Sequence, residues 1–160
     1  MIRPATTNDA EQIASLYNYY VEKTTVTFEE DSLPASEVAR RITAVMLDNP
    51  WLVAEQQGSI TGYAYAAPFE TRTSYRHSVE TSIYLAKNKI RQGLGTDLYA
   101  ALIENLRNCD RHCAIGRIAL PNDASIALHE KLGFTKVAQL NEIGYKFEQW
   151  IDVGYWELLL

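Results

Sequence analysis

The sequence predicts a mixed α/β domain with a central sheet of about six or seven strands flanked by about four helices. Apolar runs of period two alternate with runs at helical spacing along the chain. Two neighbouring strand-like runs are joined by a short Gln-Gly-Ser turn, which is typical of a hairpin. The 160 residues suit one domain, residues 1–160, and contain no linker, repeat or low-complexity segment.

A helix is expected to follow a short first strand at residues 2–5. Asn8 and, three residues later, Glu11 are spaced as in a capping box, which marks a helix start. The apolar residues of this helix recur at helical spacing: Ile13, Leu16, Tyr17 and Tyr20. Residues 24–33 are polar except for Phe28 and are predicted to form a loop.

The middle of the chain is predicted to hold a second helix and three strands. Pro34 begins the helix, since proline is favoured in a first turn, and Pro50 lies beyond its end. Residues 51–56 and 60–67 are predicted to pair as a hairpin. After a polar loop, a further strand is expected at residues 78–85.

The C-terminal half continues the same alternation. We predict a helix over residues 95–108, a strand over 114–120 and a helix over 123–132. Two extended runs follow, at 135–140 and 153–159.

Charge and composition exclude several classes of function. A net charge of −5 argues against a general binder of nucleic acid or membrane surfaces. The N-terminus has no apolar signal segment and no run approaches the ~20 apolar residues of a membrane helix, so a cytoplasmic location is expected. The spacing of Cys109 and Cys113 suits neither a zinc pair nor a redox motif, which predicts two reduced thiols and no metal.

A glycine turn follows the strand at 78–85 and opens a helix. Gly93 and Gly95 lack Cβ atoms, so the backbone can come close to an anion, and the helix N-terminus offers unpaired N–H groups. Arg91 adds a cation. We therefore predict a site for the pyrophosphate of a nucleotide-bearing thioester. A plain sharp turn is the alternative, and a Walker loop is disfavoured because no Gly-Lys-Ser/Thr follows.

Longer strings point to a family. The RQGLGT turn at 91–96 and the ALHEKLGF string at 127–134 resemble the GNAT superfamily of N-acetyltransferases. Three further strings, VET at 79–81, LPND at 120–123 and WIDVGYW at 150–156, resemble its phosphinothricin / L-amino acid N-acetyltransferase group. The likeness covers almost the whole chain. It implies a mostly antiparallel GNAT sheet, acetyl-CoA as the acetyl donor, a small-molecule amine as acceptor, and a homodimer.

The resemblance also implies where acetyl-CoA binds. Its pantetheine amides would pair with the backbone of the strand at 78–85 as an added strand, and its pyrophosphate would lie on the glycine turn. Ile90 departs from the family, which usually has Gln or Arg there. Asn122 would either bind the pantetheine arm or cap its own helix. The residues implied to contact acetyl-CoA are Ile83, Tyr84, Leu85, Arg91, Gln92, Gly93, Leu94, Gly95, Thr96, Asn122, Ser125 and Lys131.

Glu80 and His129 are the catalytic candidates. Acetyl transfer needs a neutral amine, and a carboxylate on a central strand can remove the proton of an ammonium as general base, the role that the resemblance implies for Glu80. His129 titrates near neutrality and would assist Glu80 or protonate the departing thiolate. The alternatives are a glutamate that faces solvent or pairs with a lysine, and a histidine satisfied at a helix surface.

The loop at 68–75 is implied to bind the acceptor. By resemblance, Arg72 and Tyr75 would bind an acidic group and Phe28 would close the pocket. Glu70 stands where relatives often have lysine, which weakens the case for a doubly anionic acceptor such as phosphinothricin. The main prediction is direct acetyl transfer to the α-amine of a small amino acid or analogue in a ternary complex. Acetylation of a protein or peptide N-terminus and a non-catalytic acetyl-CoA-binding module are the alternatives.

Overall fold

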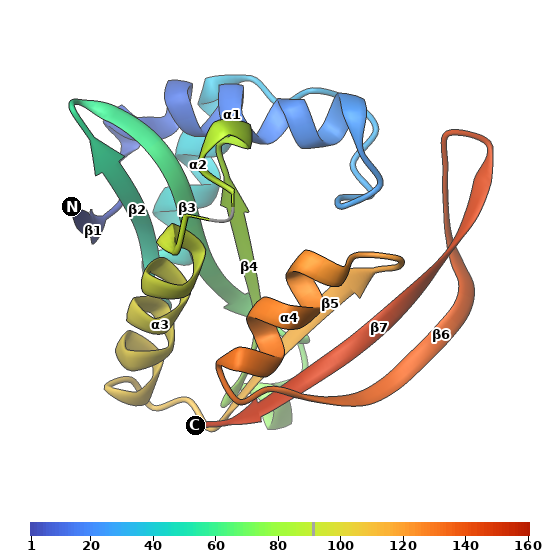
Figure 1. The fold of residues 1–160 in the computed structure, drawn as a ribbon. Coiled ribbons are helices and arrows are strands. Elements are labelled where there is room, and N and C mark those ends of the chain that lie inside the picture. Colours follow the sequence, from blue (N-terminus) through green and yellow to red (C-terminus); the bar gives the residue numbers. More distant parts are fainter. Residues whose placement is uncertain (91) are drawn as a thin grey trace.

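A seven-stranded sheet forms the centre of the computed structural model, which describes residues 1–90 and 92–160 (Figure 1). The strand order is β1-β2-β3-β4-β5-β7-β6, and every neighbouring pair is antiparallel except β4 and β5. This confirms the predicted fold class. The strands are β1 Ile2–Pro4, β2 Trp51–Gln56, β3 Ser59–Pro68, β4 Ser78–Leu85, β5 Cys113–Ala119, β6 Thr135–Lys146 and β7 Gln149–Leu159.

Four α-helices cover the two faces of the sheet. They are α1 Ala10–Lys23, α2 Ala35–Val45, α3 Leu94–Arg107 and α4 Asp123–Lys131. Short 3₁₀ turns lie at Thr7–Asp9, Thr73–Tyr75 and Lys87–Lys89. Along β2, Leu52 and Ala54 pack on the α3 side, whereas Trp51 and Val53 pack on the α1 and α2 side. Successive side chains of a strand point to opposite faces, so this strand serves both cores and is apolar throughout.

The first helix turn differs from the sequence prediction. The capping box is formed by Thr6 and Asp9, and not by Asn8 and Glu11. The backbone N–H of Thr6 donates to the Asp9 carboxylate over 2.8 Å, and the Arg3 guanidinium pairs with the same carboxylate over 2.7 Å. Hydrogen bonds from Arg3 lower the pKa of Asp9 to about 2. The spacing of residues 6 and 9 fits the motif as well as that of 8 and 11, and the ion pair with the first strand decides between them.

The C-terminal hairpin is longer than the two runs predicted at 135–140 and 153–159. Register shifts between Lys136 and Ala138 and between Leu140 and Gly144 interrupt the alternation of β6, which hid the strand in the sequence. The β6–β7 hairpin extends away from the rest of the sheet, and its tip rises toward the loop after α1 (Figure 1). This places the hairpin beside the loop that carries Phe28, the residue predicted to close the acceptor pocket.

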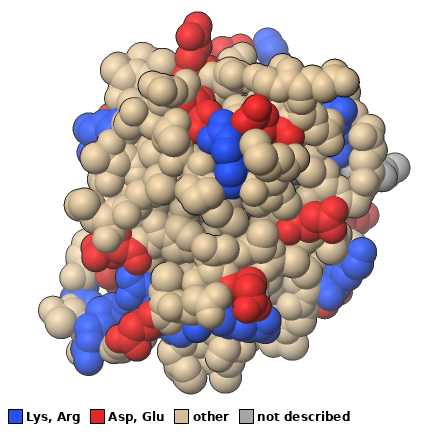
Figure 2. Space-filling view, turned by 90° about the vertical axis from the view of Figure 1, so that its left-hand side faces the viewer, with Lys and Arg blue, Asp and Glu red and all other residues tan. Residues whose placement is uncertain are grey.

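The surface and the helices show two further features. On the face seen in Figure 2, Lys and Arg side chains are interspersed with Asp and Glu and form no continuous basic patch. Within residues 1–90 and 92–160, no helix has both the length and the apolar character needed to cross a membrane.

Candidate active site

Strands β4 and β5 pair only over a short length and then separate. Their parallel pairing runs from Ser78–Cys113 to Thr81–Gly116, whereas β4 stays paired with β3 as far as Leu85. The gap that opens beyond Thr81 leaves one edge of β4 without a strand partner. Strands β4 and β5 are the only parallel pair in the described sheet, and they lie at its centre.

The open edge of β4 exposes the backbone of alternate residues. Ala86 N–H donates to the Thr61 carbonyl over 2.9 Å, and hydrogen-bonded residues alternate along an antiparallel strand. Ile83 and Leu85 therefore direct their N–H and C=O groups away from β3, and the Leu85 carbonyl accepts from the Tyr20 hydroxyl of α1 over 2.6 Å. Tyr84, which the sequence also assigned to backbone pairing with the cofactor, lies opposite Tyr63 and bonds to β3 instead.

A groove of about 610 Å³ runs along this gap on the α3 and α4 side of the sheet. It brings together most residues predicted to contact acetyl-CoA: Ile83, Leu85, Gly93, Gly95, Thr96, Asn122, Ser125 and Lys131. Gln92 instead donates from its side chain to the Asn88 carbonyl over 2.8 Å, and Leu94 packs on the hydrophobic core. Arg91, the predicted cation of the turn, lies outside the described residues.

Two helices begin at the groove. Gly93 is the N-cap of α3 with φ of 83°, a left-handed conformation that favours glycine. A Cβ on Gly95 would lie 3.1 Å from Leu85 Cδ1, a tight contact that glycine avoids where α3 approaches β4. At α4, the side chain of Asn122 accepts from the Ser125 N–H over 3.1 Å, so the helix-capping alternative for Asn122 holds. The unpaired N–H groups of both first turns favour an anion.

A small cavity of about 40 Å³ occupies the gap between β4 and β5. It shares Ile83, Asn122 and Ser125 with the groove, and it shares Ser82 and Arg117 with a pocket on the opposite face of the sheet. The three hollows therefore adjoin through the gap. Val26 of the loop after α1 lines all three, so a ligand laid in the groove can reach the opposite pocket beside this loop, where the two strands separate.

His129 lies under this cavity and is 4% exposed. Its Nδ1 is 2.8 Å from the Ser125 carbonyl oxygen and its Nε2 is 3.0 Å from the Tyr99 hydroxyl. A carbonyl only accepts, so Nδ1 carries the proton and Nε2 accepts from Tyr99. Burial lowers the pKa of His129, which keeps the ring neutral at neutral pH. A Cβ on Gly116 would overlap the ring, so glycine at this position makes room for it.

The pocket on the α1 side, about 350 Å³, is lined by Glu80 and Phe28, two of the residues predicted for catalysis and for the acceptor site. Glu80 is paired with Arg117, whose guanidinium donates to Oε2 of the carboxylate. This hydrogen bond raises the pKa of Arg117 further. The remaining lining is mostly apolar and aromatic: Val26, Thr27, Ser82, Tyr84, Ala119, Ile143, Val153 and Tyr155.

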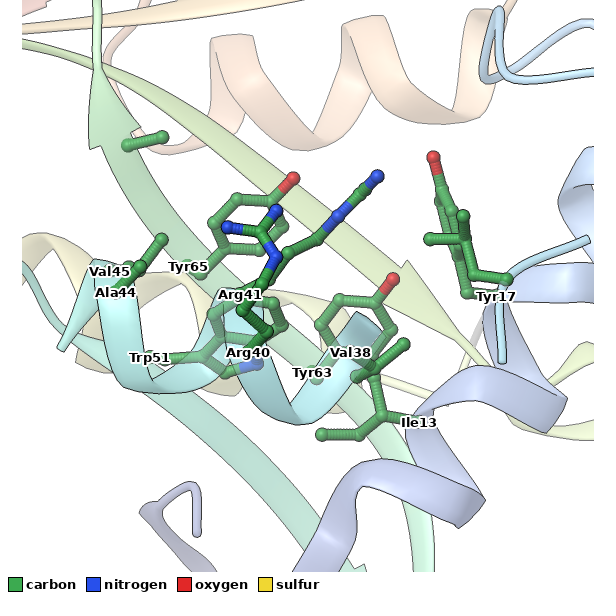
Figure 3. Close-up of a pocket in the computed structure, with 12 residues that line it drawn as sticks. Ile13, Tyr17, Val38, Arg40, Arg41, Ala44, Val45, Trp51, Tyr63 and Tyr65 are labelled. Atoms are coloured by element: carbon green, nitrogen blue, oxygen red, sulfur yellow. The ribbon is translucent and has the colours of Figure 1, made fainter. Parts of the chain in front are cut away.

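Arg72 and Tyr75 lie away from this lining, on the exposed loop between β3 and β4. The Tyr75 ring packs edge-on against Phe69 with centroids 5.9 Å apart. A further hollow of about 250 Å³ lies between α2 and β3, where Trp51 stacks on Tyr65 with centroids 4.3 Å apart (Figure 3). It shares no lining residue with the pocket that contains Glu80.

Comparison with known proteins identifies the family. The acetyltransferase (GNAT) domain matches residues 2–154. The chain belongs to the GNAT acetyltransferase family. It is 37% identical over 98% of its length to a phosphinothricin N-acetyltransferase of Streptomyces viridochromogenes, of which it covers 85%. It is 34% identical over 99% of its length to the L-amino acid N-acyltransferase MnaT of Escherichia coli, of which it covers 93%.

Solved structures of other GNAT proteins match the whole chain. The acetyltransferase yncA of Salmonella typhimurium, solved with its cofactor acetyl-CoA, has a TM-score of 0.98 at 34% identity, with 100% of this chain and 93% of that one covered. A ribosomal-protein-alanine N-acetyltransferase of Brucella melitensis has a TM-score of 0.97 at 36% identity, with 100% and 99% covered.

Two residues of this GNAT site escaped the sequence reasoning. Arg117 is the one charged residue in an apolar strand, a signal that is easily taken for an ordinary solvent-facing position. In the sequence, Tyr99 cannot be told from the other apolar residues of α3. Only the structure shows that its hydroxyl makes hydrogen bonds to both Thr81 and His129.

Proposed function

We propose that this protein transfers the acetyl group of acetyl-CoA to the α-amine of a small amino acid or amino-acid analogue. The single observation that carries the proposal is the connection of a groove on one face of the sheet to a pocket with a carboxylate on the other, through the gap between β4 and β5. Such a passage suits a thioester carried on a long arm and an amine that meets it from the opposite side.

The groove fits the two parts of acetyl-CoA that need specific contacts. The N-terminus of α3 at Gly93 and Gly95 suits a pyrophosphate, because its backbone N–H groups are unpaired. The N–H and C=O groups of Ile83 and the N–H of Leu85, which have no strand partner at this edge, suit the pantetheine amides, which would extend the sheet by a short strand. One N–H at this edge would also stabilise negative charge on the thioester oxygen during transfer.

Glu80 is the proposed general base. Its carboxylate accepts a proton from the substrate ammonium, and the neutral amine attacks the thioester carbonyl directly. A C–N bond forms, the C–S bond breaks, and the thiolate takes up a proton to become CoA thiol. Overall, ammonium and acetyl-CoA give the acetamide, CoA thiol and one proton, with no covalent acetyl-enzyme.

His129 is proposed to act beside the thioester through its position in the gap. Its proton lies on Nδ1, and hydrogen bonds to Ser125 and Tyr99 hold its neutral ring in place. The ring thereby forms a fixed part of the wall of the small cavity. Proton delivery to the leaving thiolate by His129, which the resemblance implies, stays a prediction. The role of Arg72 and Tyr75 in holding an acidic acceptor also stays a prediction.

Acetylation of a protein or peptide N-terminus is the second candidate function. The similarity to the ribosomal-protein-alanine N-acetyltransferase of Brucella melitensis favours it. The pocket of about 350 Å³ that Phe28 and Glu80 line favours a small acceptor instead.

Release of CoA thiol from acetyl-CoA tests the proposal. The acceptor panel would hold free L-amino acids, methionine sulfone and sulfoximine, phosphinothricin, and short peptides. Turnover on free amino acids or their analogues is expected. Turnover on peptides alone would move the assignment to the second candidate, and tight acetyl-CoA binding without turnover would indicate a binding module.

We further propose that the enzyme works in the cytoplasm as a homodimer. Cys109 and Cys113 are free thiols, as expected where thiols stay reduced. The β6–β7 hairpin carries large exposed apolar side chains, which a second copy would cover: Val137, Leu140, Ile143, Tyr145, Phe147 and Trp150. Light scattering coupled to gel filtration is expected to give twice the mass of the chain.

A further inference from the structure

Arg117 and Glu80 form an ion pair inside the acceptor pocket. Glu80 pairs in register with Ile115 of β5, so Arg117, two residues further along that strand, lies on the same face of the sheet. Its guanidinium donates to Glu80 Oε2, and the two side chains are 47% and 22% exposed. The pair is therefore open to the pocket and to exchange with a charged ligand.

The rest of the pocket makes this pair unusual. Of the described residues that line it, Arg117 is the one cation and Glu80 the one anion. The others are uncharged and mostly apolar or aromatic, among them Phe28, Val153 and Tyr155. The pocket therefore holds one cation and one anion side by side, which are the two charges needed to receive the carboxylate and the ammonium of an α-amino acid.

We propose that Arg117 binds the α-carboxylate of the acceptor while Glu80 receives its α-ammonium. This deepens, and rests on, the acetyl transfer proposed for the same site. The acceptor exchanges partners with the protein's own pair: the guanidinium leaves Glu80 for the substrate carboxylate, which it can bind through two parallel hydrogen bonds, and Glu80 turns to the ammonium. Binding then frees the carboxylate that removes the proton, so the base is engaged only when a zwitterion is present.

The surrounding lining restricts the side chain of the acceptor. With Arg117 on the α-carboxylate, a second anionic group would face Glu80 and apolar surface with no further cation from the pocket lining. An uncharged side chain would pack on Phe28 and Tyr155 instead. The acceptor class is thus a free α-amino acid with an uncharged side chain, and an amine without an adjacent carboxylate is a poor substrate.

The experiment compares each acid with its own carboxamide, which keeps the amine and the side chain but removes the negative charge. L-Methionine sulfone and L-leucine, each with its α-carboxamide, would be assayed by CoA release. The wild type is expected to favour the acid by about 10–100-fold in kcat/KM, as a charge-assisted hydrogen bond suggests. In Arg117→Met this preference should fall to within about 3-fold, mainly through a higher KM for the acid, while turnover on the carboxamide remains.

Two further variants serve as a conservative substitution and as a control. Arg117→Lys keeps the charge without the planar fork, so an intermediate preference is expected. Arg107→Met removes the arginine of a surface pair with Glu104, at 3.8 Å on α3, and should leave the preference unchanged.

Three results would overturn the inference. Equal kcat/KM for acid and carboxamide in the wild type would remove Arg117 as a carboxylate-binding residue while leaving acetyl transfer intact. Loss of the preference in Arg72→Met but not in Arg117→Met would assign the carboxylate to the β3–β4 loop. Absence of turnover on every amine would instead contradict the proposed function itself.

Discussion

The hydroxyl of Tyr99 lies 3.0 Å from Nε2 of His129, and it also lies 2.6 Å from the Thr81 hydroxyl. Since His129 Nε2 accepts, Tyr99 donates to it and in turn accepts from Thr81. This chain of hydrogen bonds joins β4, α3 and α4 beneath the gap between β4 and β5. It fixes one tautomer of the histidine and holds α4 where its first turn faces the groove.

Removing the Tyr99 hydroxyl should therefore destabilise the fold. Tyr99→Phe leaves Nε2 of His129 without its donor in a buried site, and the expected loss is about 1–3 kcal/mol in the free energy of unfolding. Urea denaturation measures it. Tyr145→Phe, on the exposed part of β6, is the matched control and should change stability by less than about 0.5 kcal/mol. Equal effects of the two substitutions would contradict the hydrogen-bond chain.

Stability should fall in mild acid because of His129. Burial lowers its pKa below the usual value of 6.5, so between the two values the unfolded chain binds more protons than the folded one. The free energy of unfolding therefore decreases as the pH drops below about 6.5 and is fully restored above it. Thermal unfolding from pH 5 to 8 should show this decrease, and His129→Gln should lack that part of it. His112→Gln, which changes an exposed histidine, should keep it. An unaltered profile in His129→Gln would exclude His129 as its source.

Lys146 should hold the proposed acceptor pocket in shape. Its ammonium, on a residue that is 2% exposed, donates to the Val21 carbonyl over 2.7 Å and to the Thr27 carbonyl over 2.8 Å. Val21 lies in the last turn of α1, whose carbonyls have no partner within the helix. Nearby, a Cβ on Gly144 would overlap Phe28, so β6 and the loop after α1 are closely packed.

Lys146→Met is expected to loosen that loop. Protease cleavage within residues 24–34 should become faster, and the KM for the acceptor should rise several-fold while the KM for acetyl-CoA stays within about twofold. Lys136→Met, on the exposed start of β6, serves as the control. A parallel rise of both KM values would mean that Lys146 acts on the whole fold and not on the pocket.

Much of the fold could be predicted from the sequence because its signals are local. The strand at 78–85 was predicted with the bounds that β4 has, and the positions of Gly93 and Gly95 at the start of α3 followed from backbone chemistry alone. Glu80 and Phe28 were expected in one acceptor site, and the structure brings them to one pocket.

The parts that could not be predicted depend on contacts between distant residues. The full length of β6 was hidden because its register shifts break the alternation that marks a strand. The Arg117–Glu80 pair joins residues 37 apart in the chain, and Lys146 reaches carbonyls more than 100 residues away. No local pattern encodes such pairs, which arise only when β5 is laid beside β4 and the hairpin beside α1.

The rate of acetyl transfer by Glu80→Gln is the most direct test of the central claim that this carboxylate is the base. With saturating acetyl-CoA and the best free amino acid, turnover is expected to fall about 10²–10⁴-fold, and to recover in part as the pH rises and more amine is neutral. The affinity for acetyl-CoA should stay within about twofold, and Glu104→Gln on the outer face of α3 should keep wild-type turnover. Wild-type turnover in Glu80→Gln would contradict the assignment of Glu80 as the base.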